Sequence, residues 1–444
     1  MKRSTLTLAI LLSLGLTACG GGGGGSGTAN PIDPGAGTGG TNPPVTTADA
    51  CTNIDGDQAS VPPGHTASGT TCTLVDACLN YDGNQTLVEI ADKGFVCDDA
   101  SGNCQLERNH AALSTTGIDV VRMAGYTGNG IGVAIVDTGY LPDHSEYMNS
   151  LVVAASYHDA NANYILDAGE KVDGDYSTDV PEHGTAVTSQ AGGMKSGTAT
   201  ACSLYLKGVH GDMSSQHLLI ATKDAIQSEG LPVINHSNAI ASDAMIYWSA
   251  SAGYDPTGLM FVLSNSGSVL VSAAGNSATS LSESFDSVKA VAPEFESFLD
   301  YPQEAENFLA VGSYDRENND LALYSNYPGH RESFQSRFIV AGDYAYEAAS
   351  STGSNAFEWV LGTSAAAPQV SGAIAVLMEV KPGLTAIEAA QILLDTAKQL
   401  PEWGYGQTCT EKTDLGTFTT DCGAMKFGRG LMDLPKAVEM VRGM

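Results

Sequence analysis

A continuous apolar run at residues 131–136, closed by Asp137, constrains the fold of this chain more than any other feature. The run reads Ile-Gly-Val-Ala-Ile-Val, without the polar alternation of a strand that has one solvated face, so it predicts a parallel strand buried on both faces. Further strands are expected at 203–209, 232–235, 269–273 and 308–311, and helices at 215–228 and after Ser364. Strands that alternate with helices predict an α/β domain with a doubly wound, mostly parallel sheet. Chemistry in such sheets gathers at the carboxyl ends of the strands, where Asp137 stands.

A segment of small residues around Ser364 is the second constraint. Residues 361–370 read Leu-Gly-Thr-Ser-Ala-Ala-Ala-Pro-Gln-Val, and they run into a nearly all-apolar stretch at 371–378. This pattern predicts a buried helix whose positive end faces Ser364, with small neighbours that let a peptide backbone approach. Ser364 is therefore a candidate nucleophile. A Gly-Thr-Ser triplet is also a common helix cap, so the interpretation depends on chemical partners elsewhere.

Two other segments supply such partners. Residues 182–189 read Glu-His-Gly-Thr-Ala-Val-Thr-Ser and place His183 at an expected helix start, and residues 271–277 place Asn276 directly after an apolar strand. Taken singly, a histidine here indicates a structural role and Asn276 a turn. Together with Asp137 and Ser364, they supply the base, the orienting carboxylate, the nucleophile and the oxyanion donor that acyl transfer needs.

The order of these four residues along the chain resembles that of the subtilisin-like serine proteases, or subtilases. The matching motifs are Val-Ala-Ile-Val-Asp-Thr-Gly at 133–139, His-Gly-Thr at 183–185, Ala-Ala-Gly-Asn at 273–276 and Gly-Thr-Ser-x-Ala-Ala-Pro at 362–368. The resemblance spans about 110–444 and implies an endopeptidase that acts on protein or peptide substrates without a catalytic cofactor. It implies that Ser364 attacks the carbonyl, His183 transfers the proton, Asp137 holds the imidazole, and Asn276 binds the oxyanion.

Two positions and one segment depart from the family pattern. Ala186 stands where the histidine motif usually carries a second histidine, and Ala365 replaces the methionine that usually follows the nucleophile. Neither position carries the proton or the charge, so activity is still expected. Residues 235–239 read Asn-His-Ser-Asn-Ala where the family commonly has Ser-x-Gly beside the substrate, and they leave the preferred cleavage site unpredicted.

Other classes fit the sequence less well. An aspartic protease needs two Asp-Thr-Gly loops to form its carboxylate pair, and this chain has one, at Asp137. An α/β-hydrolase needs Gly-x-Ser-x-Gly, which is absent. An exported binding protein that kept the fold and lost the chemistry is the remaining alternative, and the presence of all four chemical groups favours the enzyme.

The charge balance argues against nucleic-acid binding. The chain has 50 acidic and 20 basic residues and a net charge of −30, which becomes −32 when a leader containing Lys2 and Arg3 is removed. Nucleic-acid recognition needs clustered lysine and arginine. We interpret the acidity as a solubility feature of a protein outside the cell, with an acidic binding face as the alternative.

Residues 1–18 have the features of a secretory signal peptide. A basic start at Lys2 and Arg3 precedes an apolar core at 6–16, which is too short to span a membrane. The small-residue ending before Cys19 resembles the lipobox of bacterial lipoproteins, in which this cysteine is lipidated. The alternative is a plain signal peptide followed by a chance cysteine. Lipidation would place the protein in the bacterial cell envelope, at the outer membrane or cell surface, with later release by cleavage left open.

Two segments are expected before the catalytic domain at 110–444. Residues 19–48 consist almost entirely of small residues and proline, so they predict a flexible tether with a typical reach of roughly 30 Å. Residues 49–109 form a small Cys-rich extension, in which an exported setting favours disulfides over zinc thiolates.

The cysteine count makes a prediction about that extension. If Cys19 is lipidated, eight of the nine cysteines remain, five in the extension and three at Cys202, Cys409 and Cys422. Five is odd, so full pairing predicts a disulfide between extension and protease. Cys409 and Cys422 are expected to close a local loop, which leaves Cys202 as the expected crossing partner.

One loop has the ligand spacing of a calcium site. Oxygen donors stand at positions 1, 3, 5, 9 and 12 of an EF-hand-like loop: Asp159, Asn161, Asn163, Asp167 and Glu170. Position 6, normally glycine, is Tyr164. The sequence therefore predicts either a structural calcium site or a plain acidic loop.

Overall fold

The computed structural model describes residues 65–68, 71–74, 95–98, 103–106, 110–161, 163, 165–174, 182–209, 215–237, 259–284, 286, 306–342 and 346–444. The chain divides into two units, Met1–Pro43 and Pro44–Met444, and all described residues belong to the second. The predicted signal peptide, Cys19 and the tether lie outside the described residues. No helix in the described ranges combines the length and hydropathy that a membrane span needs.

Two short hairpins are described within the predicted extension. β1 (His65–Ser68) pairs with β2 (Thr71–Leu74), and β3 (Phe95–Asp98) pairs with β4 (Asn103–Leu106), both antiparallel. The register of the second hairpin sets Cys97 opposite Cys104.

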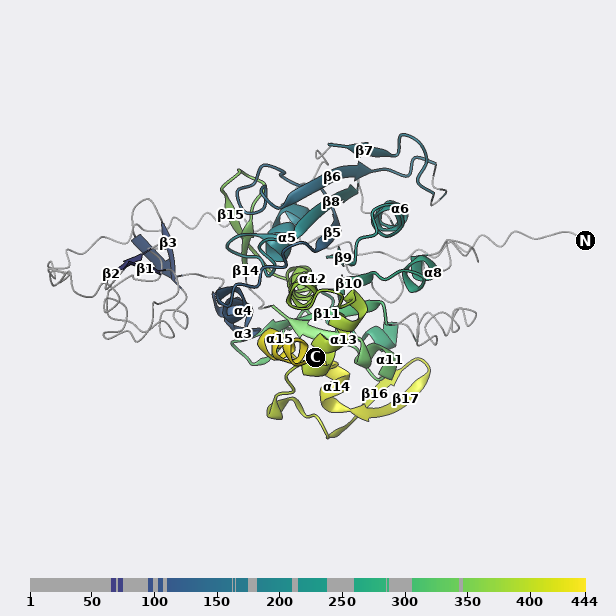
Figure 1. The fold of residues 1–444 in the computed structure, drawn as a ribbon. Helices are drawn as coiled ribbons and strands as arrows, with labels where there is room; N and C mark the ends of the chain where they lie inside the picture. Colours follow the sequence, from purple (N-terminus) through teal and green to yellow (C-terminus); the bar gives the residue numbers. More distant parts are fainter. Residues whose placement is uncertain are drawn as a thin grey trace, which may run out of the picture. The chain divides into compact units, whose positions relative to one another are not determined.

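The body of the second unit is built on one large sheet, ordered β12-β11-β10-β9-β5-β8-β6-β7, with β13 pairing with β11 (Figure 1). All neighbouring strands are parallel except β7 and β12, which pair antiparallel at the two ends of the order. The strands are β5 (Gly132–Asp137), β6 (Leu151–Tyr157), β7 (Lys171–Asp173), β8 (Ser203–Val209), β9 (Val233–His236), β10 (Val269–Ala273), β11 (Phe308–Asp315), β12 (Asp320–Leu321) and β13 (Phe338–Ala341). The doubly wound, mostly parallel sheet predicted from the sequence is confirmed.

Helices cover both faces of this sheet because its central strand is apolar on both faces. In β5, Val133 and Ile135 pack into one buried cluster with α5 (Glu182–Gly192) and α12 (Thr363–Val380). Ala134 and Val136 pack into a second cluster with α6 (Ser215–Gln227) and α8 (Leu259–Ser264). The first cluster also holds α3 (His110–Thr115), α4 (Ile118–Met123), α13 (Ala386–Thr396) and α15 (Leu434–Gly443). The alternation along a single strand thus fixes which helices pack on which face.

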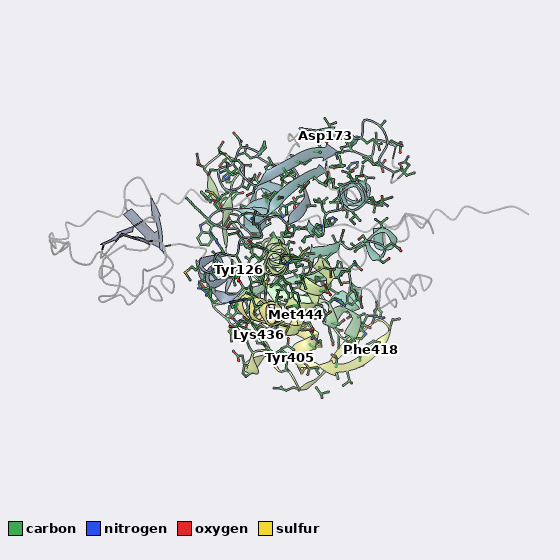
Figure 2. All side chains as sticks on the ribbon, viewed as in Figure 1. Tyr126, Asp173, Tyr405, Phe418, Lys436 and Met444 are labelled. Carbon is green, nitrogen blue, oxygen red and sulfur yellow. A yellow bond between two sulfur atoms is a disulfide. The ribbon has the colours of Figure 1, made fainter. Side chains whose placement is uncertain are left out.

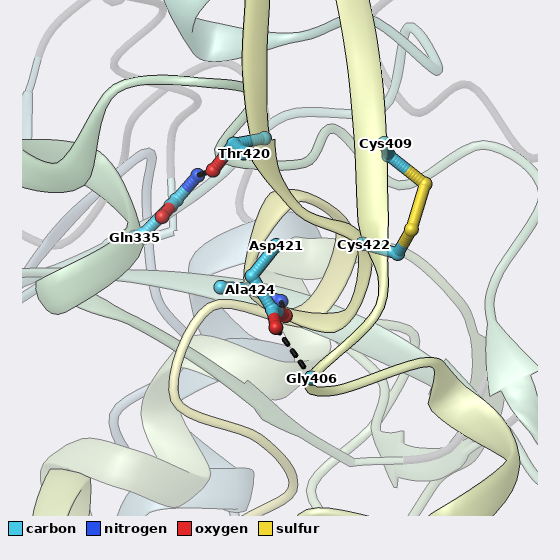
Figure 3. Close-up of a disulfide and its surroundings, with 7 residues drawn as sticks. All are labelled: Gln335, Gly406, Cys409, Thr420, Asp421, Cys422 and Ala424. Carbon is cyan, nitrogen blue, oxygen red and sulfur yellow. Dashed lines mark hydrogen bonds between the residues drawn. A yellow bond between two sulfur atoms is a disulfide. The ribbon is translucent and has the colours of Figure 1, made fainter.

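A hairpin near the C-terminus extends from this body. β16 (Thr408–Thr413) and β17 (Gly416–Asp421) are antiparallel, and α14 (Cys422–Phe427) follows them. The predicted local disulfide Cys409–Cys422 is present at the base of the hairpin (Figure 3). Phe418, labelled in Figure 2, stacks on His330 with ring centroids 3.8 Å apart and so holds the hairpin against the body.

The prediction that Cys202 crosses to the extension is wrong for this structure. Cys202 is a free cysteine, 1% exposed, directly before β8. Its side chain packs against Gly192 and Gly128. A Cβ added to these glycines would lie 3.1 and 3.4 Å from the cysteine side chain. Burial raises the pKa of the thiol to about 12. Counting cysteines missed this outcome because a buried thiol packs as a small apolar group and needs no partner.

Candidate active site

Asp137 and His183 meet at the carboxyl end of the central strand. Asp137 ends β5 and is fully buried, and His183 is the second residue of α5. His183 Nδ1 lies 2.7 Å from Asp137 Oδ1, which also accepts the backbone N–H of Thr138 at 2.7 Å. Gly184 N–H donates to Thr138 Oγ1 at 3.2 Å and fixes the start of α5 against the end of β5. With Nδ1 donating to the carboxylate, Nε2 is the nitrogen of neutral His183 that accepts protons.

The surroundings of this pair favour a charged histidine. Burial lowers the pKa of His183. The charge of Asp137 and the hydrogen bond to it together raise this pKa by more, so that it lies above its ordinary value of 6.5. The second carboxylate oxygen, Asp137 Oδ2, is buried and has no hydrogen-bond partner among the described residues. Its negative charge is therefore available to stabilise an imidazolium.

Ser364 lies in the first turn of α12, next to the end of β9. Its Oγ donates to the carbonyl of Ser237 at 2.6 Å, and Ser237 Oγ donates in return to the carbonyl of Ser364 at 2.8 Å. The second bond follows from Pro368, which has no N–H to offer the carbonyl four residues before it. The hydroxyl thus has the end of β9, and not His183, as its hydrogen-bond partner.

Asn276 follows β10 and is locked to the residues before the nucleophile. Its Oδ1 accepts the backbone N–H of Thr363 at 2.9 Å and the hydroxyl of Thr363 at 3.0 Å. Gly362, with φ of 124°, caps α12 in a conformation that only glycine adopts readily. A Cβ there would stand 3.2 Å from Asn276 Nδ2, so the missing side chain leaves space for the amide.

Comparison with known proteins settles the family. The model of the subtilase family, Peptidase S8, matches residues 128–421. The chain belongs to the subtilase family. It is 27% identical to subtilisin DY of Bacillus licheniformis over 295 residues, 65% of this chain and 90% of that protein.

Solved structures that are similar to this subtilase include two proteases. A protease from Pseudoalteromonas arctica is 20% identical, with a TM-score of 0.48, and covers 74% of this chain and 94% of its own. The prenylagaramide maturation protease PagA is 19% identical, with a TM-score of 0.45, and covers 74% of this chain and 99% of its own. The family model and the relationship to subtilisin DY make this chain a subtilisin-like serine protease, as its motifs implied.

The predicted calcium loop of this subtilase closes on itself through its own polar groups. Asp167 Oδ2 accepts the side-chain amides of Asn161 at 2.8 Å and Asn163 at 2.9 Å. Glu170 accepts the backbone N–H groups of Ala160 and Asp167 at 2.9 and 2.8 Å, and Asp159 Oδ1 accepts that of Asn163 at 3.2 Å. Among the described residues no three acidic, histidine or cysteine side chains converge as a metal site requires. These bonds join the described residues of the loop, and calcium binding stays a prediction.

A second buried polar cluster of the subtilase escaped the sequence analysis. Lys207 in β8 is fully buried, and its Nζ lies 2.8 Å from Tyr157 Oη, 3.1 Å from Asp224 and 2.9 Å from Glu229. Lys171 reaches the same Asp224 oxygen at 2.9 Å. The cluster joins β6, β7, β8 and α6. A lone lysine inside an otherwise apolar strand is the one sequence signal that indicates such a partner network.

Four further residues support the predicted site residues, and the sequence did not assign them this role. Ser237 contacts Ser364 and Thr363 contacts Asn276, whereas Tyr324 and Asn326 contact backbone groups next to these residues. Thr363 lies inside the nucleophile motif and Ser237 in the segment 235–239 that departs from the family pattern, but only the fold shows what they bond to. Tyr324 Oη accepts the N–H of Gly362 at 3.0 Å, from a segment that no motif marks.

Proposed function

We propose that this subtilase is a lipid-anchored, extracytoplasmic serine endopeptidase in which Ser364, His183 and Asp137 hydrolyse peptide bonds. The observation that carries the proposal is the 2.7 Å hydrogen bond between His183 and a fully buried Asp137. This pair lies at the carboxyl ends of the parallel strands, where α12 also presents Ser364. The bond fixes the histidine tautomer that a serine nucleophile needs. Its substrates are proteins or peptides.

Acylation starts when the hydroxyl of Ser364 turns from the Ser237 carbonyl toward His183. Ser364 Oγ then forms a bond to the substrate carbonyl carbon, and its proton passes to His183 Nε2. Asp137 stabilises the imidazolium so formed. The carbonyl oxygen, now negative, accepts hydrogen bonds from Asn276 Nδ2 and the backbone N–H of Ser364.

The intermediate collapses when His183 returns its proton to the leaving amine. A water molecule then attacks the acyl-enzyme, again with His183 as the base, and Ser364 is released. Each step is a nucleophilic attack, a proton transfer or an oxyanion contact that groups of this site or water supply, so the proposal includes no catalytic cofactor.

The location in the envelope is supported by the sequence. The signal-peptide pattern at 1–18 before Cys19, the small residues and prolines at 19–48, and a net charge of −32 after processing all fit an exported lipoprotein. The Cys409–Cys422 disulfide fits an oxidising compartment. Labelling bacteria with an alkyne fatty acid tests the anchor: the wild type takes up label and sediments with membranes, whereas Cys19→Ser does neither. Equal labelling of both would contradict lipidation at Cys19.

Hydrolysis by the Ser364→Ala variant tests the catalytic proposal. The purified wild type is expected to cleave casein into peptides, and Ser364→Ala to lose this cleavage while keeping its melting temperature. Ser336→Ala, a serine on an exposed helix end, is the matched control and keeps full activity. A wild type that binds casein without cleaving it would favour the binding-protein alternative.

A further inference from the structure

We propose that Asn326 is a positioning residue that holds the oxyanion loop, defined here as residues 274–279, in the shape that aims Asn276 at the reacting carbonyl. The inference rests on the proposed function, in which Asn276 stabilises the oxyanion. Asn326 is only 5% exposed and lies between β12 and α11 (Glu332–Ser336), about 50 residues beyond the loop that it contacts.

Asn326 contacts backbone groups on both sides of Asn276. Its Nδ2 donates to the carbonyl of Ala274 at 2.9 Å, two residues before Asn276. Its Oδ1 accepts the backbone N–H groups of Ser277 and Thr279, both at 3.0 Å, and the hydroxyl of Thr279 at 3.1 Å. Its own N–H donates to the carbonyl of Gly275 at 2.9 Å. The side-chain amide and the backbone N–H of one buried residue therefore bond backbone groups on both sides of the oxyanion donor.

The loop needs such a brace because its local backbone preferences oppose its shape. Gly275 has φ of 108°, and Ala278 has φ of 54°, a left-handed conformation that a residue with a Cβ rarely adopts. Ala278 N–H donates to the carbonyl of Tyr324 at 2.8 Å, so the same segment that carries Asn326 also holds the strained residue. Tertiary contacts, and not local sequence, set the path of the loop.

The geometry of Asn276 then depends on two anchors. Thr363 fixes its side-chain oxygen from the nucleophile helix, and Asn326 fixes its backbone from the loop side. An oxyanion donor acts only when its hydrogen lies within bonding distance of the developing charge. Displacement by about 1 Å costs on the order of 10²-fold in rate. Loss of Asn326 is therefore expected to reduce stabilisation of the transition state more than it reduces substrate binding.

Asn307 provides a matched control, because it contacts the chain at the start of β10, whereas Asn326 contacts it after the end of β10. It is 3% exposed, and its Nδ2 donates to the carbonyl of Ser268 at 2.7 Å, directly before β10, whereas Asn326 braces the loop directly after β10. Both are buried asparagines that hold a backbone carbonyl next to one strand. A purely structural role predicts the same behaviour for both; a positioning role predicts a difference in kcat.

The test measures kcat, KM and melting temperature on a peptide substrate for six proteins: the wild type, Asn326→Ala, Asn326→Asp, Asn307→Ala, Asn276→Ala and the double variant Asn276→Ala with Asn326→Ala. Asn326→Ala is expected to lower kcat by about tenfold to hundredfold with KM changed by less than about twofold. Added to Asn276→Ala, it should cost less than about threefold, because the donor that it positions is already gone. Asn307→Ala should lower the melting temperature and keep kcat.

Asn326→Asp separates the two halves of the contact. It keeps an oxygen for Ser277 and Thr279 but loses the donor to Ala274, so a partial loss of kcat is expected, and this variant decides the case if Asn326→Ala does not fold. An unchanged kcat in Asn326→Asp, or the full Asn326→Ala loss repeated in the Asn276→Ala background, overturns the positioning role alone. A wild type without Ser364-dependent hydrolysis overturns the proposed function and this inference with it.

Discussion

Asp137 at the end of β5 and Asp224 in α6 are both buried carboxylates, yet their surroundings differ. In the register of β5 and β8, Val136 lies beside Lys207 and Asp137 beside Gly208, so Lys207 and Asp137 extend from opposite faces of the sheet. Asp224 is bonded by Lys207, Lys171 and Tyr157 on the face covered by α6. Among the described residues, Asp137 forms a hydrogen bond with one ionisable side chain, His183, and its second oxygen has no hydrogen-bond partner. Two lysines offset the charge of Asp224, which suits a structural role. The charge of Asp137 is offset less fully and is therefore available to stabilise a charged His183 during the reaction.

The pKa shifts express the same contrast. Burial alone would raise the pKa of Asp224, but the hydrogen bonds from Tyr157 and Lys171 and the charge of Lys207 lower it far below its ordinary value. Its folded pKa is depressed, so its stabilising contribution is present above its unfolded pKa of about 3.9 and is lost as pH falls through the folded pKa.

The sign is reversed for His183. Its folded pKa is raised, so its stabilising contribution is complete below its ordinary value of 6.5 and is lost as pH rises through the folded pKa. The same rise produces the neutral base that the proposed reaction needs. The Asp137–His183 pair is therefore least stabilising where it is most active, and the Asp224 cluster is fully stabilising there.

The largest expected effect comes from Asp137→Asn. The substitution removes the carboxylate that accepts the hydrogen bond of His183 Nδ1 and so fixes its tautomer. The kcat on a peptide substrate is expected to fall by about 10⁴ while the fold is kept. Asp224→Asn is the counterpart and should keep kcat while lowering the free energy of unfolding. Equal kcat losses in the two variants would remove the distinction between the two carboxylates.

Lys207→Met has the next largest effect, and it acts on stability. Removal of a buried cation leaves Asp224 and Glu229 undercompensated, so the free energy of unfolding should fall by about 3–5 kcal/mol in urea titrations. Lys426→Met is the control, because Lys426 and Asp320 form an exposed pair that contributes about 0–1 kcal/mol. Similar losses in both variants would contradict the account of the cluster.

Asn276→Ala should lower kcat by about 10²–10³ with little change in KM, because the amide acts mainly on the developing oxyanion. Steady-state kinetics on one peptide substrate measures it. A rise in KM with kcat unchanged would make Asn276 a substrate-binding residue instead.

The smallest effect concerns calcium at the loop 159–170, which connects β6 to β7 and so supports Lys171. If calcium binds there, a chelator should lower the melting temperature, since a ligand at 100 times its Kd adds about 2.7 kcal/mol. The substitution Asp167→Asn should reduce that response. An unchanged melt in excess chelator would leave a plain acidic loop.

The sequence predicted the elements that continuous patterns encode. The apolar runs located β5, β8, β10 and α12, because burial on both faces requires unbroken apolar residues. The motifs located Asp137, His183, Asn276 and Ser364, but their roles are still predictions. Contacts between distant segments were not predictable: nothing in the spacing connects Asn326 to Ala274, or Lys207 to Asp224. The fate of Cys202 depends on packing, which a count of cysteines does not contain.

The rate at which a phosphonylating reagent modifies Ser364, followed against pH and mapped by mass spectrometry, tests the central claim most directly. The account predicts a single labelled residue, Ser364, and a rate that rises as His183 loses its proton, with a midpoint above 6.5 in the wild type. Asp137→Asn should react more slowly and with its midpoint at lower pH, because burial alone then acts on His183. Labelling at another residue, or a His183→Ala variant that reacts as fast as the wild type, would contradict it.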